Sequence, residues 1–152
     1  MNKRLFLLFA FFGLLGLGGA LFGWKWYSGE QSAFRGRAVP VKGLPEEMAK
    51  SWEDAFGEAL KREAVLQAIV DASDYSERLE VPAGEAVAHL RKAVVVRFKN
   101  SNKTIEVGLI GKRKEDASLI KIAEVLYEEA QKEVLEIEPS FQAYLDALSE
   151  KR

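Results

Sequence analysis

An unbroken apolar run opens the hydrophobic pattern of this chain. It covers residues 5–24 (LFLLFAFFGLLGLGGALFGW), twenty residues without a charge. At about 1.5 Å per residue, a helix of this length spans about 30 Å, the hydrocarbon thickness of a bilayer. We therefore predict that residues 1–27 form a cytoplasmic N-terminus and a transmembrane anchor, with Lys3 and Arg4 on the cytoplasmic side. The residues assigned to the anchor include Leu5, Phe12, Gly16, Gly19, Gly23 and Trp24.

A cleaved signal peptide is the alternative interpretation of this run. Its apolar core would be residues 5–15, and residues 18–20 (GGA) would offer small side chains to a peptidase. We favour a retained anchor because the apolar residues continue past Ala20. Under both interpretations the rest of the chain is exported.

The pattern changes to the shorter periods of a folded domain after a polar connector at residues 28–32. Residues 33–41 have the composition of a first strand, in which Gly36 and Pro40 favour an edge position or a bulge. Pro45 then begins a helical pattern in which apolar residues recur every three or four positions as far as Val70, with Gly57 marking a kink or a break. Residues 71–82 are predicted to be a loop, and residues 84–91 a short helix.

The clearest signal of secondary structure is an antiparallel hairpin with one buried face. Apolar residues alternate with polar ones on both sides of a turn at residues 100–103 (NSNK). Arg97 and Glu106 fall on the opposite, exposed face, where opposite charges on neighbouring strands are favourable. The residues predicted to face the core are Val94, Val96, Phe98, Ile105, Val107 and Leu109.

Two helical patterns follow the hairpin. After a charged link at residues 111–115, Asp116 is predicted to cap a helix with an apolar stripe that extends to Val134. Pro139 ends that helix, and Ser140 is predicted to cap a last short one. This order of elements predicts an α+β domain at residues 33–152, in which a small antiparallel sheet carries its helices on one face.

Composition narrows the classes of function. Without Lys3 and Arg4 the chain has 20 basic and 23 acidic residues, so the exported part is mildly acidic and we expect no nucleic-acid partner. There is no cysteine, which excludes disulfides and thiolate chemistry within the chain, and His89 is the only histidine. We expect no cofactor and no metal site.

Few residues are candidates for chemistry. His89 has Glu85 four positions earlier, the spacing of an acid–imidazole pair, but no nucleophile lies nearby and a surface histidine is the favoured interpretation. Adjacent carboxylates fall on predicted helix faces or helix starts rather than across a cleft, as a glycosidase requires. The basic run at residues 112–114 (KRK) could contact anionic headgroups or an acidic glycan, although an exposed loop is the commoner role.

The order and spacing of the elements resemble a known family. Residues 34–41, 60–70 (LKREAVLQAIV), 90–110 and 115–120 (EDASLI) are similar to the periplasmic base domain of the Wzz-type polysaccharide co-polymerases, also called chain-length determinants. The resemblance covers roughly residues 5–133 and lies in hydrophobic pattern more than in any single residue. Members of that family also have a long helical arm and a second membrane helix, and some carry a tyrosine kinase. These 152 residues contain no second apolar span and no phosphate-binding loop.

The resemblance implies a non-catalytic, single-pass protein of cell-envelope polysaccharide biogenesis. It would act as an oligomeric scaffold or chain-length-type regulator in the bacterial inner membrane, with its C-terminal domain on the periplasmic side. The expected partners are membrane lipid, further copies of the chain, and a polysaccharide polymerase or exporter. The alternative is a single-pass scaffold subunit of a secretion, pilus or division machine, and an exported hydrolase using His89 is the least favoured hypothesis.

Overall fold

The computed structural model describes residues 31–149, and the predicted anchor lies outside them. No helix among these residues combines the length and the hydropathy needed to cross a membrane. In chain order the elements are β1 (Ser32–Pro40), α2 (Glu46–Ala59), α3 (Glu63–Ala72), α4 (Tyr75–Leu79), α5 (Ala86–Ala93), β2 (Val94–Lys99), β3 (Thr104–Lys112), α6 (Asp116–Ile137) and α7 (Ser140–Ser149), with short 3-10 turns at Ala83–Glu85 and Arg113–Glu115.

The three strands form one antiparallel sheet in the order β1-β3-β2. The predicted hairpin is confirmed as β2 and β3, and Arg97 lies opposite Glu106 as expected. β1 is an edge strand, as Gly36 and Pro40 predicted. It has no bulge, because its pairing with β3 is continuous from Ser32 opposite Lys112 to Pro40 opposite Thr104.

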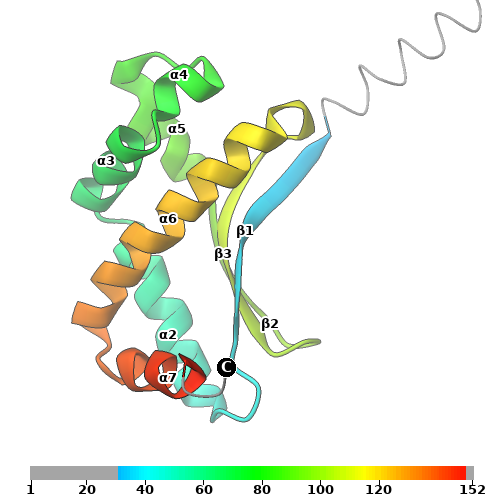
Figure 1. The fold of residues 1–152 in the computed structure, drawn as a ribbon, viewed down its shortest axis with the longest axis vertical. Coiled ribbons are helices and arrows are strands. Elements are labelled where there is room, and N and C mark those ends of the chain that lie inside the picture. Colours follow the sequence, from blue (N-terminus) through cyan, green and yellow to red (C-terminus); the bar gives the residue numbers. More distant parts are fainter. Residues whose placement is uncertain (1–30, 150–152) are drawn as a thin grey trace, which may run out of the picture.

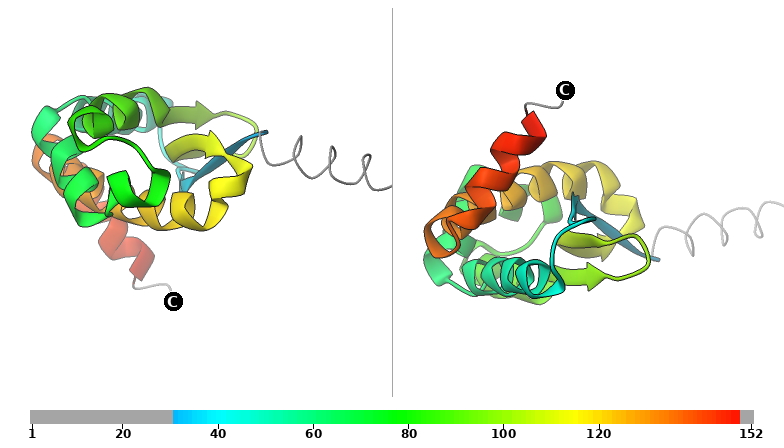
Figure 2. Two further views of the ribbon diagram at one scale, coloured as in Figure 1. Left: turned by 90° about the horizontal axis from the view of Figure 1, so that it is seen from above. Right: turned by 90° about the horizontal axis from the view of Figure 1, so that it is seen from below.

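All the helices lie on one side of the sheet (Figure 1), so the predicted α+β arrangement is confirmed for the described residues. The long helix α6 packs on β1 and β3, while α2 packs on β2. Seen from above and from below, the helices form an arc and the strands lie at its open side (Figure 2).

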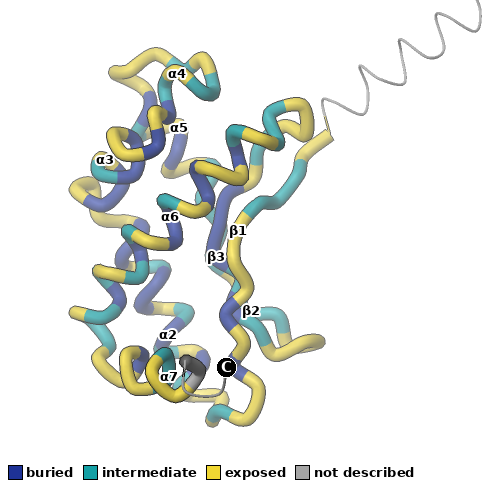
Figure 3. The backbone as a smooth tube through the Cα atoms, in the orientation of Figure 1, coloured by how far each residue is buried: buried dark blue, intermediate teal, exposed yellow. Residues whose placement is uncertain are grey.

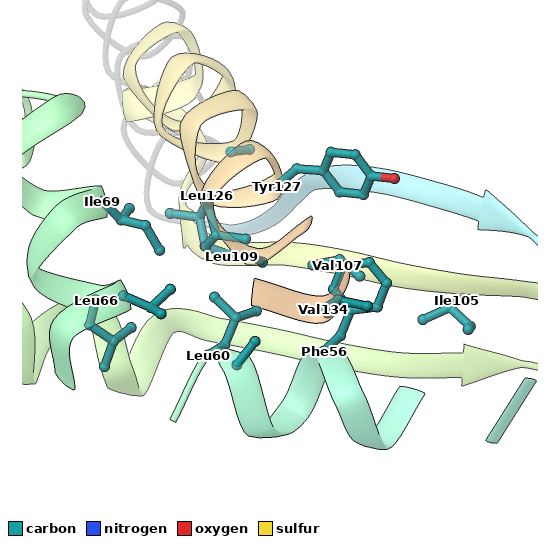
Figure 4. Close-up of a cluster of buried hydrophobic side chains, with 14 of the residues drawn as sticks. Phe56, Leu60, Leu66, Ile69, Ile105, Val107, Leu109, Leu126, Tyr127 and Val134 are labelled. Carbon is teal, nitrogen blue, oxygen red and sulfur yellow. The ribbon is translucent and has the colours of Figure 1, made fainter. Parts of the chain in front are cut away.

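The core lies between this sheet and the helices. Ile105, Val107 and Leu109 are fully buried, while Val94, Val96 and Phe98 are partly buried against the same cluster. Figure 3 shows the buried backbone concentrated in β3 and on the inner sides of the helices, and Figure 4 shows side chains of α2, α3 and α6 meeting those of β3. The predicted core face of the hairpin is therefore confirmed. The apolar stripe predicted for α6 is buried as well, at Leu119, Ile122, Ala123, Leu126, Ala130 and Val134.

The helical pattern that begins at Pro45 is divided into two helices. α2 ends at Ala59, and α3 begins at Glu63. The predicted break therefore exists, but it falls at residues 60–62, and Gly57 itself lies inside α2. The glutamates of the first turn, Glu46 and Glu47, lie where the helix dipole favours negative charge.

The predicted loop at residues 71–82 is partly wrong. α3 continues to Ala72, and Tyr75–Leu79 forms a five-residue helix between Asp74 and Glu80, both of which adopt left-handed backbone conformations. Two of its residues pack inward, since Tyr75 is fully buried and Leu79 contacts the core. The prediction failed because a helix this short has no repeating apolar stripe to reveal it.

The charged link and the helix cap predicted after the hairpin also need correction. β3 continues to Lys112, and Arg113–Glu115 forms a 3-10 turn. Asp116 is the first residue of α6 rather than its cap, and no side chain caps that helix. The Asp116 carboxylate instead forms an ion pair with Arg35 of β1, a contact between residues far apart in the sequence.

Candidate functional site

The start of β1 and the end of β3 meet at one end of the domain. Ser32 pairs with Lys112, and the backbone N–H of Arg113 donates to the Gln31 carbonyl at 2.8 Å, which extends the ladder by one step. The basic run (Lys112, Arg113 and Lys114) therefore lies beside the strand that follows the predicted anchor. We call this end of the domain the anchor-proximal end. In Figure 1 it lies at the start of α6, while α7 lies at the opposite end.

A hollow of about 490 Å³ opens at the anchor-proximal end, between α5 and the last residues of β3. Its charged walls carry two lysines, one histidine and one carboxylate, and the rest is small or apolar. The residues that line it are Ser32, Leu79, His89, Lys92, Ala93, Ile110, Gly111, Lys112 and Glu115. We call this hollow the α5–β3 cavity.

His89 lines this cavity and is exposed, as the favoured interpretation expected, and its ring contacts a tyrosine rather than Glu85. The phenol oxygen of Tyr75 lies 2.9 Å from Nδ1 of His89, and Glu85 forms no hydrogen bond or ion pair with that ring. Burial raises the pKa of Tyr75 to about 12, with a further contribution from the nearby Glu115 carboxylate. Tyr75 is therefore neutral at physiological pH, and its phenol contacts the His89 ring at the wall of the cavity.

Glu115 is the acidic wall of the cavity. Its carboxylate accepts a hydrogen bond from the backbone N–H of Lys112 at 3.3 Å, which closes the 3-10 turn before α6. Glu115 therefore lines the same hollow as Lys92 and Lys112.

The other surface that stands out is the face of the sheet opposite the helices, which we call the open face. Phe34, Val95 and Ile110 lie on it, and Ile110 is 39% exposed. Gly36 and Gly108 face each other between them, so closely that a Cβ on Gly36 would lie 2.2 Å from the Val107 carbonyl oxygen. The missing side chains leave room for the ring of Phe34, whose Cζ would lie 2.8 Å from that Cβ. The open face is therefore partly apolar.

Charged residues border the open face. The Arg97 guanidinium lies 5.1 Å from the centre of the Phe34 ring, and it also donates to the Glu106 carboxylate at 2.7 Å. Lys99 binds the same carboxylate at 2.7 Å. Burial acts to raise the pKa of Glu106, but the hydrogen bonds from Lys99 and Arg97 outweigh it and lower the pKa. The cation–π contact of Arg97 and the ion pairs of Glu106 therefore stabilise this face of the sheet by a modest amount.

The free edges of the sheet are partly blocked from within. On β2, the Phe98 N–H donates to the Glu53 carboxylate of α2 at 2.9 Å, and the Val94 N–H donates to the Leu90 carbonyl. On β1, Pro40 has no N–H to offer, and the Phe34 carbonyl accepts a hydrogen bond from Arg35 at 2.7 Å. These contacts disfavour pairing of either edge with a foreign strand.

Several of the adjacent carboxylates have partners within the described part of the chain. Glu53 binds β2, Asp116 binds Arg35, and Glu129 forms an ion pair with Lys132 at 2.6 Å. Within residues 31–149 no cluster of three or more histidine or acidic side chains is arranged to hold a metal ion. The anchor residues and Trp24, Trp26 and Tyr27 lie outside the described part of the chain.

The sequence pointed to the basic run and to His89 separately, but not to the cavity that lies beside both. Lys92 and Ile110 belong to elements that were predicted for packing reasons alone. Only the pairing of β1 with β3 and the position of α5 bring these residues to one end of the domain. Comparisons with models of protein families, with curated proteins and with solved structures find no match for this chain.

Proposed function

We propose that this chain is a non-catalytic, membrane-anchored scaffold of cell-envelope polysaccharide biogenesis that acts by self-association. The apolar run at residues 5–24 is the proposed anchor. The position of the basic run supports this proposal, because it lies beside the strand that follows the anchor, where anionic headgroups would attract it. The order of strand, helices, hairpin and long helix is also the order expected from the resemblance to chain-length determinants.

The proposal of self-association rests on the open face. A partly apolar sheet face without covering helices, centred on Phe34, Val95 and Ile110, is a surface that a second copy can bury. Since all copies would share one anchor orientation, the assembly would be a symmetric cluster in the plane of the membrane. Such an assembly needs no reactive side chain.

Mass measurement of the full chain in mild detergent tests this proposal. We expect a multiple of the protomer mass, and we expect Val95→Glu to shift the population towards the monomer by placing a charge on the open face. Ala88→Glu on the exposed side of α5 is the matched control, because it adds the same charge away from that face. A strict monomer of the unaltered chain at high concentration contradicts the proposal.

The polysaccharide part of the proposal has its own test. Deletion of the gene in its source organism should change the length distribution of a surface polysaccharide on a gel, and the full-length gene should restore it. An unchanged distribution together with lost secretion, piliation or division would favour the alternative scaffold. Glycosyltransferase and flippase genes beside this one would favour the first proposal, and a secretion ATPase gene would favour the second.

A further inference from the structure

Two exposed isoleucines lie on different surfaces in the anchor-proximal half of the domain. Among the described residues, Ile110 and Ile120 are the large apolar side chains that are exposed, at 39% and 44%. Ile110 lies on the open face. Ile120 lies on the outer side of α6, beside a hollow of about 190 Å³ between that helix and β1, which we call the β1–α6 hollow. Covering either side chain with a second copy would remove apolar surface from water.

The two surfaces lie at nearly the same distance from the proposed anchor. The register of the sheet places Val95 of the open face level with Gly36, and Gly36 lines the β1–α6 hollow together with Ile120. Ile110 lies two residues, or about 7 Å, closer to the anchor. A rotation about an axis normal to the membrane keeps every residue at its own height. Such a rotation can therefore bring the open face of one copy against Ile120 of the next.

The charges beyond these apolar residues also match in height. On the open face, Arg97 lies two residues beyond Val95, which is about 7 Å further from the anchor. On α6, Glu124 lies four residues beyond Ile120, a rise of about 6 Å. The helix and β1 lie side by side and both lead away from the anchor-proximal end (Figure 1). An apolar contact at one level would therefore place Arg97 near Glu124 at the next.

The same rule of equal heights disfavours packing of one open face on another. Arg97 and Lys99 share a single carboxylate, that of Glu106, so this part of the open face has an excess of positive charge. Two open faces would bring these cations against their counterparts in the other copy, and like charges across an interface oppose association. The outer side of α6 instead presents the exposed carboxylates of Glu124 and Glu128.

Two arginines border the β1–α6 hollow, but both have partners within the domain. Arg35 forms its ion pair with Asp116, and the Arg37 guanidinium lies over the Tyr127 ring, 5.2 Å from its centre. Glu124 borders the same hollow and is exposed. Its carboxylate can therefore accept a cation from another copy.

We propose that the open face of one copy packs against the outer side of α6 of the next, with Val95 and Ile110 near Ile120 and Arg97 near Glu124. This inference rests on the proposed function, since the anchor gives all copies one orientation. The contact joins two different surfaces, so a pair of copies leaves one surface of each kind uncovered. The assembly is complete only when a closed cluster covers both surfaces of every copy.

Cysteine cross-linking of the full chain in membranes tests this proposal, because the chain has no cysteine of its own. Ile110→Cys and Ile120→Cys are introduced into separately tagged copies that are expressed together, and a short bis-maleimide is added. Each variant expressed alone detects contact between like surfaces. Glu136→Cys, which is exposed near the other end of α6, is the matched control for height.

We expect a cross-linked dimer from the mixed Ile110→Cys and Ile120→Cys copies, and little from either variant alone or from Ile110→Cys mixed with Glu136→Cys. The interface charge is tested separately in mild detergent. Glu124→Lys should weaken self-association about fivefold by placing an ammonium group near Arg97, whereas Glu136→Lys should leave it nearly unchanged. Circular dichroism establishes that the variants are folded.

Cross-linking of Ile110→Cys to itself in place of the mixed pair would show that open faces pack on each other, and it would overturn the proposal. Equal self-association of Glu124→Lys and Glu136→Lys would overturn it as well. The mass of the unaltered chain keeps these results separate from the proposed function. A multimer without the mixed cross-link retains the scaffold and removes this interface, whereas a strict monomer contradicts both.

Discussion

The indole Nε1 of Trp52 in α2 donates a hydrogen bond to the hydroxyl oxygen of Ser140, the first residue of α7, at 3.1 Å. Ser140 in turn donates to the Glu138 carboxylate, which also accepts a hydrogen bond from Ser51, both at 2.8 Å. Phe141 then packs edge-on against the Trp52 ring, with ring centres 4.9 Å apart. A short polar network and one aromatic contact therefore fasten the last helix to the first one of the domain.

We predict that Ser140→Ala lowers the free energy of unfolding by about 1–2 kcal/mol, because the buried Trp52 N–H loses its acceptor and Glu138 loses a donor. Urea unfolding followed by tryptophan fluorescence measures the change. Gln142→Ala, on the exposed side of the same helix, is the control and should stay within about 0.5 kcal/mol of the unaltered chain. Identical unfolding midpoints for the two variants would show that the network does not fasten α7.

The glycines of the sheet and of α2 should respond to alanine in opposite directions. Gly36→Ala places a Cβ 2.2 Å from the Val107 carbonyl oxygen and 2.7 Å from the Gly108 Cα, so the two strands must separate. We expect a loss of about 1–3 kcal/mol. Gly57→Ala has no atom within 4 Å of the new Cβ and lies inside a helix, so it should gain about 0.5–1 kcal/mol. Thermal unfolding of both variants measures the contrast, and a stabilising Gly36→Ala would refute the close approach.

The buried phenol of Tyr75 should make the domain sensitive to alkali. Burial and the Glu115 carboxylate raise the pKa of Tyr75 from 10.0 to about 12, so the folded state resists the ionisation that the unfolded chain allows. This contribution to stability is fully present below pH 10 and is lost as the pH rises from about 10 to about 12. The loss is about 1.4 kcal/mol per pH unit within that window.

Tyr75→Phe tests this dependence, with the free energy of unfolding measured in urea at pH 9 and at pH 11.5. The variant should be less stable at pH 9, because it lacks the contact with His89, but it should lose less stability between the two values. Some slope remains, since burial also raises the pKa of Tyr127. Tyr144→Phe is the control for a less buried phenol. Parallel pH profiles for Tyr75→Phe and the unaltered chain would exclude Tyr75 as the group responsible.

The carboxylate of Glu53 should protect the free edge of β2. Glu53→Ala leaves the Phe98 N–H without its acceptor, which we expect to cost about 1 kcal/mol and to promote association through β2. Asp54→Ala removes an exposed neighbouring carboxylate and is the matched control. Static light scattering during mild heating compares the two. Equal scattering from both variants would show that Glu53 is not needed to block the edge.

Most of the fold could be predicted because apolar residues recur at regular spacing along its longer helices and strands. The alternation around residues 100–103 fixed the hairpin and its core face, and the stripe from Leu119 to Val134 fixed the long helix. Short elements were not predictable in this way, since Tyr75–Leu79 is too brief to show a helical period and is bounded by left-handed Asp74 and Glu80. The role of Asp116 was missed because a helix cap is a local feature, whereas its partner Arg35 belongs to a distant strand.

The candidate site was less predictable than the fold. The charges at Lys92 and Lys112 are visible in the sequence, but nothing local indicates that α5 and the end of β3 enclose a cavity between them. Likewise, His89 was considered with its helical neighbour Glu85, while its actual partner, Tyr75, lies 14 residues earlier. Sites assembled across elements depend on strand order and helix placement, which periodicity does not determine.

The continuous pairing of β1 with β3 has a mechanical consequence. β1 is the strand that joins the predicted anchor, and its partners extend from Lys112 at one end of the domain to Thr104 at the other. Tension between the lipid and a protein bound near α7 would act along this strand and load its hydrogen bonds together, in shear, rather than one after another. A pull along β1 would therefore meet all of these hydrogen bonds at once, and β1 would resist it better than a strand whose bonds open one at a time.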